Sequence, residues 1–106
     1  MKIKVIISNR LDSVDLKLDT ERKVCKINDV VYDINVEELA FDIYSCVCNW
    51  PKQLVNERIF DGERYRVDIE TEKKQESFIG INKFPQNYRE FKEKIYTIVK
   101  SNEFRK

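Results

Sequence analysis

Three cysteines are the residues of this chain with the most reactive side chains, because a thiolate is both a nucleophile and a metal ligand. They are Cys25, Cys46 and Cys48, and the chain has no histidine. Cys46 and Cys48 stand two positions apart in a segment of helical periodicity, so their side chains diverge by roughly 200° and do not converge on one ion. Without histidine the chain also lacks the usual general base at neutral pH. We therefore predict that it is not an enzyme and has no catalytic residue, metal site or cofactor.

Carboxylates in the middle of the chain are the other side chains that could do chemistry. They are Asp61, Asp68, Glu70 and Glu72. Metal-dependent nucleases bind Mg²⁺ through acids on adjacent strands, and Asp61 followed by Glu72 has a comparable spacing. However, residues 72–75 are polar and predict a turn, and acids that alternate with apolar residues are typical of the solvated face of any sheet. A solvated face is the favoured interpretation, and a nuclease-like enzyme is the alternative.

An acidic and aromatic surface is predicted on residues 36–50. One side of this segment is an apolar stripe at helical spacing, formed by Val36, Leu39, Ala40, Ile43, Val47 and Trp50. A second stripe on its flank consists of Phe41, Tyr44 and Cys48, and the acids beside it are Glu37, Glu38 and Asp42. Either the second stripe packs inside, on the last helix or on residues 52–60, or it binds a partner protein. Residues 29–50 contain five acids and no base, which favours a basic partner.

A basic stripe is predicted on the last helix. It consists of Arg89, Lys92, Tyr96 and Lys100. Interleaved basic and aromatic side chains can bind phosphates and stack on bases, so nucleic-acid binding through this stripe is an alternative function. A plain solvated helix face is favoured instead, because acids are interspersed in the stripe and the whole chain has a net charge of only +1.

The elements that must position these residues begin with a series of strands. Residues 2–5 and 14–19 alternate apolar and charged residues with a period of two, which is typical of strands with one buried face. Residues 23–27 and 30–34 follow the same pattern, and the Asn-Asp pair between them tolerates the positive φ of a tight hairpin turn. The first third of the chain is therefore predicted to be an antiparallel meander.

A change of period at Asn35 predicts the first helix. Asn35 is a favourable N-cap, and Glu38 stands at the capping-box position. Pro51 cannot continue a helix, so the helix is predicted over residues 36–50. Residues 52–60 have no clear periodicity, and no element is assigned to them.

A second hairpin and a second helix complete the fold. Residues 65–70 and 77–82 alternate like strands, and Gly80 indicates a bulge or the close packing of a neighbour. Pro85 and Asn87 indicate the start of the last helix. The order is four strands, a helix, two strands and a helix. The sequence therefore predicts an α+β fold in which two helices pack on one face of an antiparallel sheet of about six strands.

Size and composition limit the class of protein. A chain of 106 residues can close one hydrophobic core, so residues 1–106 are predicted to form a single domain. Apolar residues make up 42% and charged residues 37% of the chain, a mixture that favours a globular protein over a disordered segment or a membrane span. The odd number of cysteines and the lack of a visible export signal favour reduced thiols and a cytoplasmic protein.

A set of residues in the 61–91 region forms a pattern of its own. The set is Asp61, Gly62, Tyr65, Val67, Phe78, Gly80, Asn82, Phe84, Pro85, Asn87, Tyr88 and Phe91. In these residues the chain resembles small bacterial α+β proteins that have no assigned activity. The resemblance implies a strand hairpin that leads through a proline turn into the last helix, and it assigns no functional residue.

A protein-binding module is the function that these features favour. A small domain with uneven charge and a spare aromatic stripe can act by covering another protein's surface. An immunity-type or inhibitor-type protein that neutralises a toxin or an enzyme is one concrete form. The predicted contact residues are Phe41, Tyr44, Cys48, Glu37, Glu38 and Asp42. The partner is expected to be another protein or a second copy of the chain.

Overall fold

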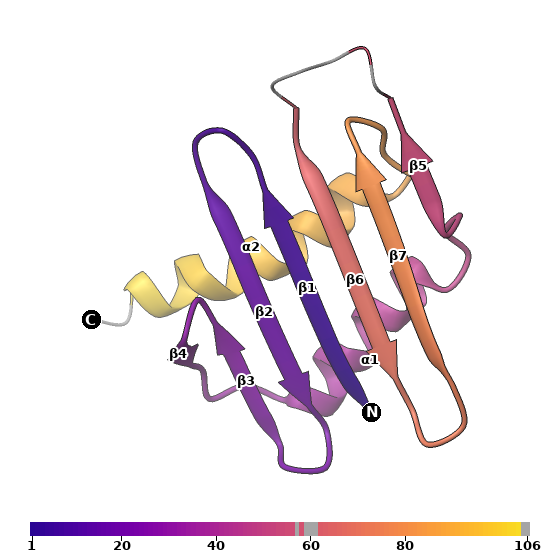
Figure 1. Ribbon diagram of the computed structural model, residues 1–106. Coiled ribbons are helices and arrows are strands. Elements are labelled where there is room, and N and C mark those ends of the chain that lie inside the picture. Colours follow the sequence, from indigo (N-terminus) through magenta and orange to yellow (C-terminus); the bar gives the residue numbers. More distant parts are fainter. Residues whose placement is uncertain (57, 59–61, 105–106) are drawn as a thin grey trace.

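The computed structural model describes residues 1–56, 58 and 62–104. In this part of the chain seven strands form one mixed sheet, and two helices cover one of its faces (Figure 1). The strands are β1 (Lys2–Ser8), β2 (Ser13–Asp19), β3 (Val24–Ile27), β4 (Val30–Val31), β5 (Gln53–Val55), β6 (Arg64–Glu70) and β7 (Gln75–Ile81). The helices are α1 (Val36–Val47) and α2 (Tyr88–Phe104). The predicted α+β class, with both helices on one face, is confirmed.

The strand order β4-β3-β2-β1-β6-β7-β5 places the first strand of the chain in the middle of the sheet. β1 pairs antiparallel with β2 on one side and with β6 on the other. In this register Ile3 lies opposite both Leu18 and Ile69, so apolar residues from three strands share the face that the helices cover. The predicted meander is thereby joined to the second hairpin through β1.

The turn between β3 and β4 has the predicted chemistry. Asn28 and Asp29 have φ angles of 51° and 66°, in the left-handed region that Asn and Asp tolerate better than most residues. β4 is shorter than the predicted 30–34 strand and ends at Val31. After it the chain turns away from the sheet into the cap of α1.

A seventh strand lies in the segment that showed no periodicity. β5 has three residues and pairs in parallel with β7, with Leu54 opposite Gly80. The prediction of a purely antiparallel sheet is therefore wrong at this edge. Three residues are too few to display a period of two. Parallel pairing needs a return connection, and the chain makes it through β6, which lies between β5 and β7 in the sequence and runs antiparallel to β7.

Gly80 is needed for close packing, as one of its two predicted interpretations states. A Cβ at this position would lie 1.8 Å from Cε2 of Tyr65, which stands directly opposite in β6. The β6–β7 register runs without interruption from Arg64 to Glu70, so there is no bulge. The glycine makes room for a buried aromatic ring on the neighbouring strand.

The first helix starts where the sequence predicts and ends earlier. The Asn35 side chain accepts a hydrogen bond from the Glu38 backbone N–H at 3.1 Å. The last helical residue is Val47, not Trp50. Beyond it the chain bends so that the buried Trp50 donates its indole N–H to Oδ1 of Asn87 at 2.6 Å. A tertiary hydrogen bond has thus replaced the last predicted turn of helix.

An aromatic cluster anchors α2 on the sheet. Trp50 and Phe91 lie edge to face with their ring centroids 5.0 Å apart, and Trp50 also lies 5.3 Å from Tyr65. Phe84 stacks on Tyr88 at 4.6 Å. These rings join the end of α1, strand β6 and the start of α2 into one core.

A helix that crosses a bilayer has to be both long and apolar. None of the helices in the described ranges is both long enough and apolar enough to cross a membrane.

Candidate functional site

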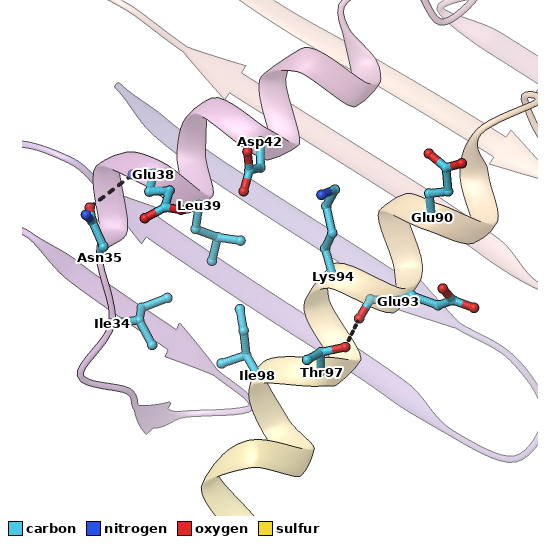
Figure 2. A pocket seen from close by; sticks show the side chains of 10 residues that line it. All are labelled: Ile34, Asn35, Glu38, Leu39, Asp42, Glu90, Glu93, Lys94, Thr97 and Ile98. Atoms are coloured by element: carbon cyan, nitrogen blue, oxygen red, sulfur yellow. Dashed lines mark hydrogen bonds between the residues drawn. The ribbon is translucent and has the colours of Figure 1, made fainter.

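A groove lies between the two helices on the face away from the sheet (Figure 2). It has a volume of about 630 Å³. Its lining is Ile34, Asn35, Glu38, Leu39, Asp42, Glu90, Glu93, Lys94, Thr97 and Ile98. We call it the interhelical groove. Since α1 and α2 come from distant parts of the chain, only the fold brings these residues together.

The helical period explains which residues reach the interhelical groove. Glu38 and Asp42 are four positions apart on α1, and Glu90, Lys94 and Thr97 follow at steps of four and three on α2. Such residues share one side of a helix. The core stripe lies beside them, so each helix buries its apolar side on the sheet and turns a charged flank toward the other helix.

The interhelical groove is strongly acidic. Its described lining includes four acidic residues and one lysine. One of the acids, Glu93, is paired with Arg89 at 3.5 Å, and its carboxylate points away from α1 in Figure 2. Figure 2 shows Asp42 and Lys94 projecting from opposite helices into the space between them. Ile34, Leu39 and Ile98 gather near the start of α1 and give that end an apolar floor. Such a lining suits a cationic side chain that carries an apolar stem, as lysine and arginine do.

The predicted partner-binding residues fall on two sides of α1. Glu38 and Asp42 line the interhelical groove, whereas Phe41, Tyr44 and Cys48 do not. Phe41 is 70% exposed and therefore does not pack inside. Tyr44 is half-buried and packs against the core cluster. Glu37 is exposed in the first turn of α1, where a negative charge interacts favourably with the helix dipole.

The three cysteines differ in their burial. All three lie in the described part of the chain and are free. Burial raises the pKa of Cys25 to about 11, which keeps this thiol protonated at neutral pH. Cys46 is half-buried against the core. Cys48 is exposed, and its thiol lies 3.6 Å from the Ser45 carbonyl oxygen.

The basic stripe of α2 is largely engaged in contacts within the molecule. Lys92 donates to Oε1 of Glu63 at 2.6 Å and lies 5.6 Å from the ring of Tyr96. Arg89 is paired with Glu93 one turn later at 3.5 Å. Arg89 and Lys100 are both exposed, and Lys100 lies at the far end of the stripe. The stripe therefore presents a broken rather than a continuous basic surface.

Glu63 is the centre of a hydrogen-bond network that the sequence did not reveal. Besides Lys92, it accepts bonds from the Tyr88 hydroxyl at 2.6 Å and from the Asn9 side-chain amide at 2.9 Å. Partial burial opposes its ionisation, but these three donors outweigh burial and lower the pKa of Glu63 below its ordinary value. Burial, and then the bond to Glu63, raises the pKa of Tyr88 well above the ordinary tyrosine value. The network ties α2 to the β1 and β6 ends of the sheet.

Of the predicted nuclease-like carboxylates, Asp68 and Glu70 lie on β6 and Glu72 lies in the turn that follows it. Asp68 accepts from the Ser77 hydroxyl at 2.6 Å and from Arg66 at 3.0 Å. Partial burial opposes its ionisation, yet these two donors lower the pKa of Asp68 below its ordinary value. Asp61 lies outside the described residues. Within the described ranges no three acids or cysteines are grouped so that they could hold a metal ion.

Comparison with protein-family models, with curated proteins and with solved structures finds no match. The resemblance of the 61–91 region therefore stays a prediction. The function has to be argued from the residues themselves.

Proposed function

We propose that this chain is a protein-binding module, of the immunity or inhibitor type, which holds a basic segment of a partner protein in the interhelical groove. The observation that carries the proposal is the excess of acids over the single lysine in the lining of a groove of about 630 Å³, where Glu38, Asp42 and Glu90 accompany Lys94. A lysine or arginine side chain would place its stem on Leu39 and Ile98 and its charge near the acids of either helix. The proposed function requires no catalysis, because binding alone would block the activity of the partner.

Charge and shape would act at different stages of binding. The acids would steer a basic partner toward the helix layer and raise the rate of association. Phe41, which is 70% exposed on the same helix, would supply apolar contact area once the partner has docked. The three free thiols suit a reducing compartment, so we place the module in the cytoplasm.

Charge reversal in the interhelical groove tests the proposal. The chain would be cross-linked in its native host and its partners quantified by mass spectrometry, for the wild type, for Glu38→Lys/Asp42→Lys and for the matched control Glu21→Lys/Glu72→Lys. We expect one stoichiometric protein that is retained by the control and lost by the groove variant. Loss in both variants, or in neither, would refute a role of the interhelical groove.

A second copy of the chain is the other occupant that this experiment can reveal. Analytical ultracentrifugation of the same three proteins separates the two cases. If the wild type and the control form a dimer and the groove variant does not, the interhelical groove binds a second copy of the chain and not a foreign partner.

A further inference from the structure

The face of the sheet opposite the helices carries a row of three lysines. Side chains alternate along each strand, so the residues between the core positions point away from the helix layer. In the register of the sheet Lys4 of β1 lies opposite Lys17 of β2, and Lys17 lies opposite Lys26 of β3. We call these three residues the lysine row. In Figure 1 neither helix covers this face, which we call the open face.

The lysine row lies in a hollow of the open face with a positive lining. The hollow has a volume of about 630 Å³. Its charged lining consists of six cations, Lys2, Lys4, Lys17, Arg22, Lys26 and Arg66, and three carboxylates, Asp19, Asp68 and Glu70. Two of these carboxylates are already paired, Asp19 with Arg22 at 4.0 Å and Asp68 with Arg66 at 3.0 Å. The surplus positive charge therefore belongs to the lysines.

The lysine row places like charges opposite each other on neighbouring strands. Like charges directly opposite each other on neighbouring strands destabilise a sheet. In the described ranges none of the three ammonium groups lies within 4.0 Å of a carboxylate oxygen, although Lys4, opposite Asp68, helps to lower the pKa of that carboxyl. Opposite charges at these facing positions would stabilise the pairing of the same strands. A bound anion would relieve the repulsion, because all three lysines line the same hollow and each ammonium group carries three donors.

The dimensions of the row limit the class of anion. Adjacent strands are about 4.8 Å apart, so the outer two lysines of the row are separated by only about 10 Å at the backbone. The row stops at Asp68, which lies opposite Lys4 on the next strand, and the carboxylates of Asp19 and Glu70 lie one step along the strands. A long nucleic-acid strand would have to pass over these acids. The described positions of the open face also include no aromatic residue on which a base could stack.

We propose that the open face binds a compact anion that carries several phosphate groups, held by Lys4, Lys17 and Lys26. This binding site is separate from the interhelical groove and does not depend on the proposed function. Inorganic tripolyphosphate is the probe that carries the required chemistry alone.

Substitution of the central lysine tests the proposal. Tripolyphosphate would be titrated at low ionic strength into the wild type and Lys17→Glu, with calorimetry for affinity and amide NMR shifts for location. We expect saturable binding with shifts confined to β1, β2 and β3, and a loss of affinity of at least about tenfold in the variant. The melting temperature of Lys17→Glu should rise, because the new carboxylate lies between two lysines. Lost binding together with a higher melting temperature cannot be attributed to unfolding.

Two further variants keep the proposal falsifiable. Lys17→Gln removes the central charge without adding a carboxylate, and it should also weaken binding without lowering the melting temperature. Lys100→Glu makes the same charge change as Lys17→Glu on the helix side, and it should keep the wild-type affinity. If Lys17→Glu and Lys100→Glu weakened tripolyphosphate binding equally, the loss of affinity would come from the net charge of the protein, and the proposal would be overturned.

Other anions decide the class of ligand. Orthophosphate should bind more weakly than tripolyphosphate, because it reaches fewer of the lysines. Equal affinities would overturn the requirement for several phosphates. A single-stranded oligonucleotide should bind more weakly than tripolyphosphate at equal phosphate concentration. Tighter binding of the oligonucleotide would show that the open face binds nucleic acid, and it would overturn the proposal of a compact anion. Absence of saturable binding to tripolyphosphate would overturn the proposal altogether.

Discussion

The two layers of this protein present opposite charges to solvent, although the chain as a whole carries only +1. The described lining of the interhelical groove has four acidic residues and one lysine, whereas that of the hollow on the open face has six cations and three carboxylates. On the helices, acids share one side because the helical period is 3.6 residues. On the strands, lysines share one face because side chains alternate with a period of two and the register aligns them across strands. The overall charge therefore says little about the partners of either face.

The two layers also differ in what holds them. Side chains hold the helix layer, through the aromatic cluster around Trp50 and the hydrogen bonds to Glu63. Backbone pairing holds the open face, and its side chains face solvent. Truncation of a side chain should therefore damage the helix layer much more than the open face, which the following predictions test.

Loss of an anchoring ring should have the largest effect. Phe91 is fully buried against Trp50, so we expect Phe91→Ala to lower the free energy of unfolding by about 3–5 kcal/mol. The matched change Ile6→Ala on the open face should cost about 1 kcal/mol or less, since this side chain is only half-buried. Urea unfolding measures both. Similar losses for the two variants would contradict the distinction between the layers.

Neutralisation of Glu63 should have the next largest effect. Glu63→Gln keeps the shape but loses the charge that faces Lys92 and the Tyr88 hydroxyl, so we expect a cost of about 1.5–3 kcal/mol. The control Glu72→Gln changes an exposed acid in the β6–β7 turn and should cost little. If both changes cost the same at pH 7, the network does not hold α2 to the sheet.

The same residue predicts a pH dependence. Because the pKa of Glu63 is lowered in the folded state, its contribution is complete above the unfolded pKa of about 4.5 and is lost as the pH falls through the folded value. The pKa of Tyr88 is raised, so its contribution is complete below about pH 10 and is lost at higher pH. Unfolding curves across pH should show the wild type losing its advantage over Glu63→Gln in acid. A constant difference between the two proteins from pH 7 to pH 3 would contradict the prediction.

Removal of the cap of α1 should have a smaller effect. We expect Asn35→Ala to cost about 1 kcal/mol, because the Glu38 backbone N–H loses its acceptor. Asn35→Ser retains an acceptor and should cost less. Thermal unfolding compares the two variants, and equal costs would show that the cap contributes little.

The smallest effect should be a gain. Lys17→Glu should raise the free energy of unfolding by about 0.2–1 kcal/mol at low salt, because it replaces two repulsive cross-strand contacts with attractive ones. The gain should shrink as salt screens the exposed charges. A loss of stability at low salt would show that the lysine row does not strain the open face.

Short-range patterns account for the parts of the fold that could be predicted. Alternation in β1 and β2, the Asn28-Asp29 turn and the Asn35 cap each depend on residues a few positions apart, and the structure confirms all of them. The position of Gly80 was also informative, because only the lack of a side chain admits the Tyr65 ring. β5 was missed because its pairing with β7 adds no local pattern to its three residues.

The candidate sites depended much more on distant contacts. The sequence could place Glu38 and Asp42 on one side of a helix, but it could not show that Glu90 and Lys94 of α2 would line the same groove. It could place Lys4 and Lys17 on the solvated side of their strands, but a shift of register by one residue would have separated them.

Local patterns were enough to predict every element except β5, the buried sides of these elements and the α+β class, because side-chain periods, caps and turns depend on residues a few positions apart. The strand order, the Glu63 network, the interhelical groove and the lysine row arise only in the folded molecule. Each of these joins residues from separate elements, and their meeting depends on the packing of the whole core.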